Sequence, residues 1–427
     1  MGKWTILRQR LHEAWLYRYG YRWMPLRQQR YVERLQRRQG PVRVVFVALN
    51  VPMWKYQGLY DLLHADQRFE VTVVLSPGIT YKAEQRLRDL QQMRDYFSCR
   101  DMSYVDWRIE DGAEPVDIRR QLNPDIVFYT QPYHGSYHDR HCFLRFTDRL
   151  TAYSPYSYLQ SHDPYNYDNV MQNVAWKCYY ANDYHIAEAR ELARNQGVNA
   201  VAVGYTSADE YTHHEHKDVW GDPGHTKKHL IWAPHCTLAN DGSVFSRSNF
   251  LMMADYMVSL AQRHADRLLI AFKPHPGLLT ELYKHPDWGK VKADEYYELW
   301  RTMPNTLLAD GTFTNLFEGS DAMVHDCGSF VVDYLYFGHP VMFVSKDIAR
   351  AKSFVNVPGQ RAYDAHYIGV TTDDVEHFVS EVVMEGKDSM EEVRRTYYQE
   401  FLKPPQGCTT AQNMYADMLR SLHMELL

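Results

Sequence analysis

The chain has 427 residues, enough for two domains with large cores, and its composition of 45% hydrophobic and 23% charged residues is that of a globular protein. Its six cysteines are scattered without a C-x-x-C pair, which excludes a disulfide framework or a cysteine zinc site and indicates a reducing compartment. No signal peptide is visible and no stretch approaches the ~20 apolar residues of a membrane span, so we expect a cytoplasmic protein.

Charge is distributed unevenly along the chain. The net charge is −6, but residues 1–40 contain ten Lys or Arg and two acidic residues, which gives +8 there and −14 elsewhere. Apolar side chains recur at helical spacing in this segment: Trp4, Leu7, Leu11, Trp15 and Tyr19. Arginines surround them: Arg8, Arg10, Arg18 and Arg22. The pattern predicts a basic amphipathic helix on an anionic membrane surface, with packing on the protein's own body as the alternative. Nucleic acid is not expected as a partner, because no nucleic-acid-binding motif follows.

Residues 41–205 alternate between predicted strands and helices, a pattern typical of a doubly wound parallel sheet. Strands are expected at 42–49, 69–75, 124–129, 156–161, 176–181 and 199–204. Helices are expected at about 54–65, 80–96 and 184–196. The polar stretch 206–228, with a turn at Asp222-Pro-Gly, is expected to be a linker.

Residues 229–405 repeat the pattern and predict a second α/β domain. Strands are expected at 229–234, 267–272, 305–309, 322–326 and 340–344. Helices are expected at about 247–264, 329–337, 373–385 and 388–402, followed by a C-terminal helix within 406–427. Two doubly wound sheets facing across a cleft form the GT-B architecture, in which ligands bind beyond the carboxyl ends of the strands.

One strand end of the second domain predicts an anion site. The strand at 322–326 ends at Asp326, Gly328 allows a close approach, and Ser329 is placed to cap the next helix. A helix start offers unpaired N–H groups and the positive end of the dipole, which suit a diphosphate. The alternative is an ordinary helix cap.

Two further strand ends carry cationic or hydrogen-bonding side chains. Lys273 and His275 lie in the segment KPHP, and His235 and Thr237 lie in WAPHCT. Either segment alone is also compatible with a structural turn. Three strand ends of one domain nevertheless converge on the same kind of chemistry, and the sequence therefore predicts a phosphate-binding rim.

The first domain offers a candidate base. The segment QSHDPYN places His162 and Asp163 after a predicted strand, and histidine has a suitable pKa for deprotonating an acceptor hydroxyl. A turn-forming His-Asp-Pro is the alternative.

Two groups of other histidines are candidate metal ligands. His134, His138 and His141 are spaced like ligands on a helix face, and His213, His214 and His216 lie in the polar linker. Neither group has cysteine support, so no metal site is predicted. The chain has no G-x-G-x-x-G or Walker sequence, which argues against NAD and ATP.

In order and spacing these motifs resemble the CDP-glycerol glycerophosphotransferase family of teichoic acid and capsule synthesis. The similar segments are GYTSADEY (204–211), IWAPH (231–235), FKPHP (272–276), LFEGSDAMVHDCGSFVVDYLYFGHPVMFV (316–344), WKYQGLYDLL (54–63) and FEVTVVL (69–75). The resemblance covers about residues 42–345. It implies a GT-B fold, a CDP-glycerol or CDP-ribitol donor, and attachment to the inner face of the plasma membrane through a basic segment.

By position, the resemblance implies that His275, Asp326 and Ser329 contact the donor diphosphate and that Asp333 supports the helix beginning at Ser329. The family motif His-Gly-Thr-Pro-Leu-Lys, which provides the proposed base, is replaced by Ser161-His162-Asp163-Pro164. The paired serine of the family is replaced by Gly328-Ser329. These departures leave room for another donor or acceptor.

The expected reaction transfers glycerol phosphate, or a related polyol phosphate, from a CDP-activated donor to a hydroxyl of a lipid-linked envelope glycan. Lys273, His275 and His235 neutralise charge on the departing CMP, and His162 takes the acceptor proton. This scheme requires no cofactor, and a weakly held Mg²⁺ is compatible with it. The alternatives are a GT-B glycosyltransferase that uses a nucleotide sugar in capsule or lipopolysaccharide synthesis, and a non-catalytic binding module.

Overall fold

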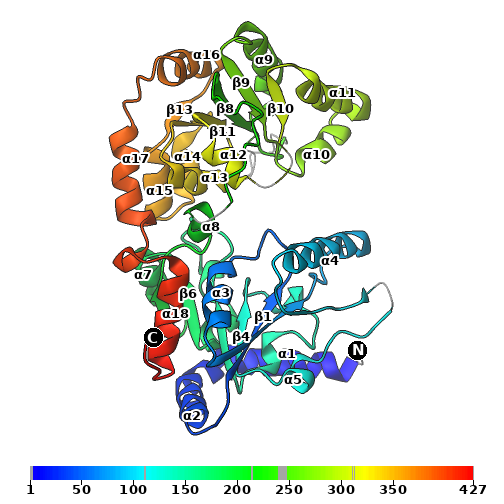
Figure 1. Ribbon diagram of the computed structural model, residues 1–427, viewed down its shortest axis with the longest axis vertical. Helices are drawn as coiled ribbons and strands as arrows, with labels where there is room; N and C mark the ends of the chain where they lie inside the picture. Colours follow the sequence, from blue (N-terminus) through cyan, green and yellow to red (C-terminus); the bar gives the residue numbers. More distant parts are fainter. Residues whose placement is uncertain are drawn as a thin grey trace. The chain divides into compact units, whose positions relative to one another are not determined.

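The computed structural model describes residues 3–109, 112–212, 215–238, 248–309, 311 and 313–426, with no side-chain description for 3–9 and 212. The chain forms two compact units (Figure 1). Unit 1 comprises Met1–Thr212 and Lys403–Leu427, and unit 2 comprises His213–Leu402. Each unit is built around its own parallel sheet.

The sheet of unit 1 has the strand order β3-β2-β1-β4-β5-β6-β7, and all neighbouring strands are parallel. The strands are β1 (Val42–Ala48), β2 (Phe69–Leu75), β3 (Tyr104–Val105), β4 (Ile126–Tyr129), β5 (Leu150–Tyr153), β6 (Lys177–Tyr180) and β7 (Ala200–Ala202). The order reverses between β1 and β4, which makes this a doubly wound sheet.

Helices cover both faces of this sheet. The α-helices of unit 1 are α1 (Lys3–Arg18), α2 (Met24–Gln36), α3 (Gln57–Ala65), α4 (Ala83–Ser98), α5 (Ile118–Gln121), α6 (Val170–Val174), α7 (Asp183–Leu192), α8 (Ala208–Thr212) and α18 (Thr410–Ser421). Short 3₁₀ turns are η1 (Gly20–Arg22), η3 (His134–Ser136), η4 (Phe143–Arg145), η5 (Pro164–Asn166) and η9 (Pro405–Gly407). Because side chains alternate along β1, Val44 and Phe46 share one core with α3, α4 and α18, whereas Val45 and Val47 share another with α5 and α6.

One predicted strand of unit 1 is wrong. Residues 156–161 form a loop, and the strand lies earlier, at β5, whose four residues are all buried. The predicted strands that correspond to β1, β2, β4, β6 and β7 are confirmed. β5 is buried on both faces, but its sequence LTAY contains a threonine and a small alanine and so lacks the apolar run typical of a buried parallel strand.

The C-terminal helix α18 packs on unit 1 beside α3 (Figure 1). The carboxylate of Asp209 accepts hydrogen bonds from the backbone N–H groups of Thr410 (2.8 Å) and Ala411 (2.7 Å) at the start of α18. Gly204 has φ +108°, and a Cβ there would lie 2.5 Å from Thr410 Oγ1. Both features fix the place of α18 in unit 1.

The sheet of unit 2 has the order β10-β9-β8-β11-β12-β13, again all parallel. Its strands are β8 (Lys228–Ala233), β9 (Leu268–Phe272), β10 (Thr306–Leu308), β11 (Ala322–His325), β12 (Val341–Val344) and β13 (Tyr367–Gly369). Its α-helices are α9 (Phe250–Arg263), α10 (Leu278–Lys284), α11 (Gly289–Thr302), α12 (Thr314–Glu318), α13 (Phe330–Asp333), α14 (Ile348–Ser353), α15 (Val357–Asp364), α16 (Thr372–His377) and α17 (Glu391–Tyr397). Every strand predicted for this half is confirmed, and β13 is an additional short edge strand.

Aromatic side chains dominate the core on one face of this sheet. Trp232 of β8 stacks on Phe250 and Phe272, with ring centroids 5.7 and 4.9 Å apart. Trp300 of α11 is fully buried against Trp232 and Phe272. This packing holds β8 and β9 rigidly at the point where their carboxyl ends carry the predicted site residues.

Three predicted helices of unit 2 are not regular α-helices throughout. The helix expected at 329–337 is one α-turn, α13, continued by the 3₁₀ helix η6 (Tyr334–Phe337). The helices expected at 373–385 and 388–402 end in the π-helical segments η7 (Phe378–Met384) and η8 (Tyr398–Leu402). Among the described residues of both units, no helix is long and apolar enough to cross a bilayer.

Candidate functional site

The three strand ends singled out in the sequence belong to neighbouring strands. β9, β8 and β11 are adjacent in the sheet of unit 2, and the strand order reverses between β8 and β11. Crossover connections leave opposite faces of a sheet at such a switch point, so the carboxyl ends of the two strands frame a ligand crevice. His235 follows β8, His275 follows β9, and Asp326 follows β11.

Asp326 joins the two sides of this switch point. Its buried carboxylate accepts hydrogen bonds from the backbone N–H groups of His235 (2.6 Å) and Asn249 (2.5 Å). Burial raises the pKa of Asp326 to about 6, although these N–H groups favour the ionised form. Asp326 therefore organises the backbone around His235. The sequence had suggested direct contact of Asp326 with the donor diphosphate and did not indicate this structural role.

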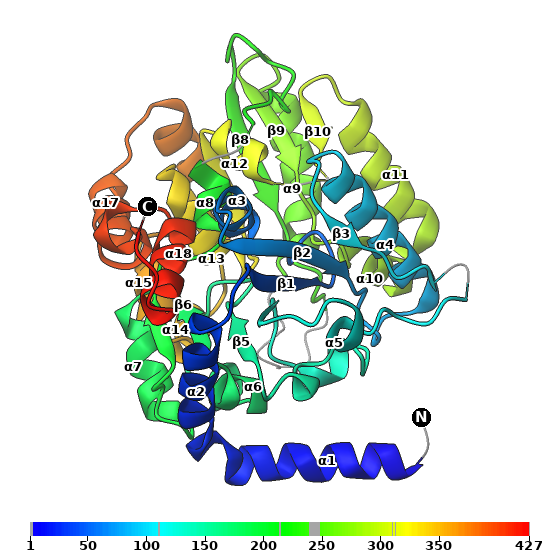
Figure 2. The same cartoon turned by 60° about the horizontal axis from the view of Figure 1, so that its bottom comes forward.

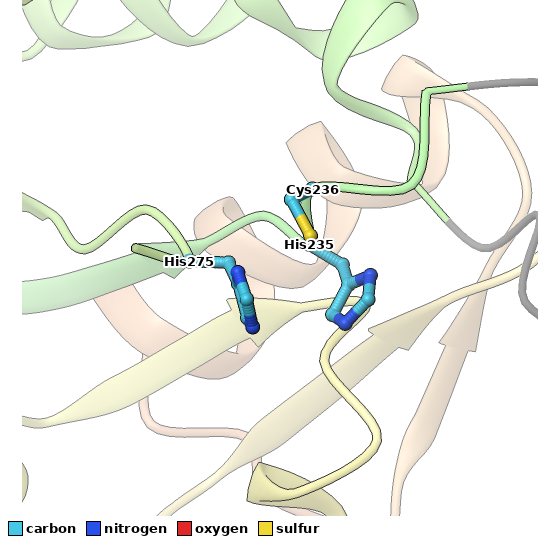
Figure 3. Close-up of side chains that lie close together, drawn as sticks. All are labelled: His235, Cys236 and His275. Atoms are coloured by element: carbon cyan, nitrogen blue, oxygen red, sulfur yellow. The ribbon is translucent and has the colours of Figure 1, made fainter. Parts of the chain in front are cut away.

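The imidazole rings of His235 and His275 lie together, with centroids 4.7 Å apart (Figure 3). Nδ1 of His275 accepts a hydrogen bond from the N–H of Gly277 (3.0 Å), and Nδ1 of His235 accepts one from the N–H of Thr237 (3.3 Å). A neutral imidazole with an accepting Nδ1 carries its proton on Nε2. Burial lowers the pKa of His275, so this ring is neutral near pH 7. Both rings are therefore fixed as Nε2–H donors.

Cys236 adds a sulfur to this pair, and one ligand atom from each of the three residues lies within 4.8 Å of the others (Figure 3). The bonds to Nδ1 place protons, not lone pairs, on the Nε2 atoms. Burial also raises the pKa of the Cys236 thiol, which keeps the sulfur protonated. The three residues thus favour an anion over a metal ion. The site does not fit Mg²⁺ either, because that ion prefers oxygen ligands. The nearby carboxylate is Asp326, and both of its oxygens already accept hydrogen bonds from backbone N–H groups.

The remaining predicted donor-site residues lie at the same edge with less direct roles. Lys273 is buried, and its ammonium donates to the carbonyl oxygens of Gly311 (3.1 Å) and Ala309 (3.4 Å). Thr237 places its hydroxyl oxygen 3.0 Å from Nδ1 of His235. Both residues therefore position the strand-end loops.

A helix starts after Ser329 as predicted, but without the expected side-chain cap. Ser329 is exposed, has helical backbone angles (φ −65°, ψ −35°) and makes no side-chain capping bond. Ser329 therefore stands at the predicted N-cap position of α13, but without the extended angles and the side-chain hydrogen bond of a typical cap. Because α13 is a single turn, its dipole is also weaker than that of a long helix. Gly328 is half-buried before this turn, and Asp333 is buried within it.

In unit 1, His162 lies in the loop that follows β5. Its Nδ1 is 3.0 Å from the Oε1 atom of Glu188 on α7. Asp163 caps η5 by accepting the N–H of Tyr165 (2.9 Å). Glu188 could not be identified from the sequence, because it lies 26 residues from His162 on a helix whose spacing does not indicate which loop it faces.

The other histidines have structural partners. His134, His138 and His141 do not share a helix face: His134 pairs with Glu13, and the buried His141 lies between Ser76 Oγ and the Val116 carbonyl. His216 pairs with Glu318, while His213 and His214 lie outside the described residues.

A second histidine–carboxylate group lies at the opposite ends of β8 and β11. His225, His229 and Asp321 place ligand atoms within 4.8 Å of one another. Asp321 already accepts hydrogen bonds from Lys228 Nζ (2.8 Å), His225 Nε2 (2.7 Å) and the His229 N–H (2.7 Å). A carboxylate that already accepts three hydrogen bonds is better suited to hold the starts of two strands together than to bind a metal ion.

No protein-family model and no curated protein sequence matches the chain. Solved structures match its fold. The S. aureus MnaA–UDP complex has a TM-score of 0.57 at 13% identity and covers 90% of this chain and 98% of its own. The Neisseria meningitidis UDP-GlcNAc 2-epimerase bound to UDP-GlcNAc has a TM-score of 0.57 at 12% identity and covers 89% and 100%.

The wall teichoic acid polymerase TagF, as a variant soaked with CDPG, has a TM-score of 0.53 at 11% identity and covers 99% of this chain and 98% of its own. Sequence identities this low bear on the fold alone. Together with the two parallel sheets, these comparisons show that the chain has a GT-B-like α/β fold.

Proposed function

We propose that the protein is an enzyme that transfers glycerol phosphate, or a related polyol phosphate, from a CDP-activated donor to a hydroxyl of a lipid-linked envelope glycan. The observation that carries this proposal is the pair of Nε2–H donors, His235 and His275, at the switch point of unit 2. Two Nε2–H donors beside each other suit phosphate oxygens. The shared fold with a teichoic acid polymerase structure soaked with CDPG supports the choice of donor.

In this reaction the acceptor oxygen forms a bond to the β-phosphorus while the bond from that phosphorus to the bridging oxygen breaks. CMP leaves with the electron pair of the broken bond. His235 and His275 donate hydrogen bonds that stabilise the charge on the phosphates, and His162 of unit 1 takes the acceptor proton. Removing one such donor typically costs 10²–10³ in turnover.

A nucleotide-sugar enzyme is the second candidate. The MnaA–UDP and epimerase–UDP-GlcNAc complexes share this fold with TM-scores of 0.57, slightly above that of TagF. The same Nε2–H pair would then hold the diphosphate of a nucleotide sugar, and the reaction would occur on the sugar. A donor panel of CDP-glycerol, CDP-ribitol and UDP-, GDP- and CMP-sugars separates the two candidates.

The test is release of CMP from CDP-glycerol by purified protein with a membrane lipid extract as acceptor. His275→Ala should lower turnover about 100-fold. His285→Ala is a matched control, because Nδ1 of His285 also accepts the N–H of the residue two positions on, Asp287 (3.3 Å), but lies at the end of α10. Acceptor-dependent release that survives His275→Ala would overturn the role of His275. Absence of both release and thermal stabilisation by CDP-glycerol would overturn the choice of donor.

We also propose that the surface formed by α1, η1 and α2 binds the anionic inner face of the membrane, where a lipid-linked acceptor resides. α1 runs along the outside of unit 1 (Figure 2) and is fixed there by a hydrogen bond from Tyr17 to Asp168 (2.8 Å). Large apolar side chains remain exposed on its outer side: Leu11, Trp15, Tyr19, Trp23 and Leu26. Exposed arginines lie among them: Arg10, Arg18, Arg22, Arg27 and Arg30.

The inner side of the same segment packs on unit 1. Leu16, Met24, Tyr31 and Val32 are buried, so this side of the segment packs on the protein's own body, and the proposed membrane contact concerns the exposed side. Trp4, Leu7 and Arg8 were also predicted to belong to this amphipathic helix, but their side chains are not among those that the structure describes. Aromatic and arginine side chains mixed on one exposed surface are typical of proteins that lie on membranes.

A further inference from the structure

Glu188 is a buried carboxylate that faces the candidate base. It lies on α7, its side chain is 11% exposed, and its Oε1 atom is 3.0 Å from Nδ1 of His162. Its Oε2 atom accepts a hydrogen bond of 2.5 Å from the hydroxyl of Tyr167. Burial, followed by the charge of Glu188, raises the pKa of Tyr167, so the hydroxyl remains a donor. A carboxylate held in this way can only accept from His162.

The direction of this hydrogen bond determines which nitrogen of His162 is available. Because Glu188 accepts, Nδ1 of His162 must carry a proton, and the lone pair of the neutral ring is on Nε2. His235 and His275 have the opposite arrangement, with an accepting Nδ1 and a proton on Nε2. The chain thus presents one histidine in unit 1 as a proton acceptor and two in unit 2 as hydrogen-bond donors.

We propose that Glu188 is the positioning residue of the reaction: it holds His162 with Nδ1 protonated and Nε2 as the proton acceptor, and Tyr167 holds Glu188. This inference rests on the proposed function, because it assigns the base of that reaction. When Nε2 takes the acceptor proton, the positive charge that develops on the ring is stabilised by the carboxylate beside Nδ1.

The surroundings of His162 support a fixed orientation. Asn166 donates to the hydroxyl oxygen (2.7 Å) and the carbonyl oxygen (3.2 Å) of Ser161, which closes the loop around His162. Half of the His162 side chain remains exposed, so a substrate hydroxyl can reach the ring. A ring held on one edge and open on the other is the arrangement that a general base requires.

A second acid on the same helix provides the comparison. Glu191 is 69% exposed, and its Oε1 atom is 3.8 Å from Nε2 of His162, beyond hydrogen-bond distance. An exposed carboxylate at that separation is screened by water. Glu191→Gln is therefore the matched control for Glu188→Gln, because both remove one charge from α7 on the side that faces His162.

The primary experiment is ¹⁵N NMR of the histidine rings, which distinguishes a protonated from an unprotonated ring nitrogen and needs neither donor nor acceptor. At a pH where the ring is neutral, His162 should show the Nδ1–H tautomer, while His235 and His275 show Nε2–H. Glu188→Ala should abolish the preference of His162, and Glu191→Gln should retain it. A wild-type His162 in the Nε2–H form, or one unchanged by Glu188→Ala, would overturn the proposal.

Turnover provides a second readout. Glu188→Gln keeps a hydrogen-bond acceptor but removes the charge, so kcat should fall roughly 10- to 100-fold with KM within about twofold. Glu191→Gln should change kcat less than about twofold. If Glu188→Ala does not fold, Tyr167→Phe, which removes only the hydroxyl that holds Glu188, should still weaken the tautomer preference. A protein without CMP release but with the expected tautomers would refute the proposed reaction and leave the Glu188–His162 assignment standing.

Discussion

Replacing Trp15 and Trp23 by alanine removes two large apolar groups from the outer side of the α1–α2 segment. Trp15 is 46% exposed and Trp23 is 61% exposed. Full burial of a large apolar side chain contributes about 2.5 kcal/mol, so these fractions correspond to about 1.1 and about 1.5 kcal/mol. The double variant should therefore bind an anionic bilayer about 2.6 kcal/mol more weakly, or roughly 80-fold.

Flotation with vesicles measures this difference. Vesicles of phosphatidylglycerol mixed with phosphatidylcholine should bind the wild type, whereas phosphatidylcholine alone should bind it much less, because each arginine near an anionic surface contributes about 1 kcal/mol. Binding should also weaken as salt is added. Leu26→Ala and Leu251→Ala form a matched pair, since the two leucines are 45% and 43% exposed but only Leu26 lies on the proposed surface.

Two outcomes would refute the reasoning. Equal binding of the wild type and the Trp15→Ala, Trp23→Ala double variant would show that the aromatic side chains do not enter the bilayer. Equal losses for Leu26→Ala and Leu251→Ala would show that exposure alone, independent of place, governs binding. Circular dichroism and thermal melting of each variant control for unfolding of the segment.

The remaining predictions concern two buried carboxylates. Asp125→Asn should lower the free energy of unfolding by about 2–3 kcal/mol at pH 7, less than for a fully buried ion pair because the Arg38 side chain is 34% exposed. Burial alone would raise the pKa of Asp125, but hydrogen bonds from Arg38 and Tyr31 lower it below the ordinary value of 3.8. The ionised carboxylate therefore stabilises the fold at pH values above 3.8, and this stabilisation is lost as the pH falls below 3.8 and through the lowered pKa. Urea titrations at pH 7 and pH 3 test this, and a pH-independent difference would contradict it. Burial raises the pKa of Asp326 from 3.8 to about 6, so the wild type should lose about 3 kcal/mol of stability from this group as the pH rises from 4 to above 6. Asp326→Asn should lack that loss, and a variant that loses stability in parallel with the wild type over this range would argue against it.

Most strands of the two sheets could be predicted, because a buried parallel strand usually has a continuous run of apolar residues in the sequence. β1 and β2 are seven-residue strands rich in valine, and both were predicted within a residue. β5 (LTAY) has Thr151 and Ala152 at its centre and so lacks the run of large apolar residues that marks the equally short β4 (IVFY), and residues 156–161 after it were predicted instead. Short strands in the middle of a sheet owe their structure to their neighbours rather than to their own pattern.

The candidate site could be predicted where it follows from strand order and not where it depends on distant contacts. His235, His275 and Asp326 each follow the end of a strand, so their gathering at one edge of the sheet follows from the topology. The orientation of the imidazole rings does not follow from it, because it depends on backbone N–H groups of Gly277 and Thr237. Contacts of Glu188 and Asn249 with site residues depend on packing between elements that the sequence places far apart.

Unit 1 is assembled from two stretches of chain that are synthesised at different times. The core around α3 includes residues of α18, among them Ala411, Met414 and Met418, which leave the ribosome only after all of unit 2. At typical rates of translation this interval is roughly 10–40 s. During that time the apolar surface that receives α18 is uncovered, so the nascent unit 1 is a natural client for chaperones. A nonsense mutation before α18 would therefore damage the half of the protein that was made first, while leaving the strands of unit 2 complete.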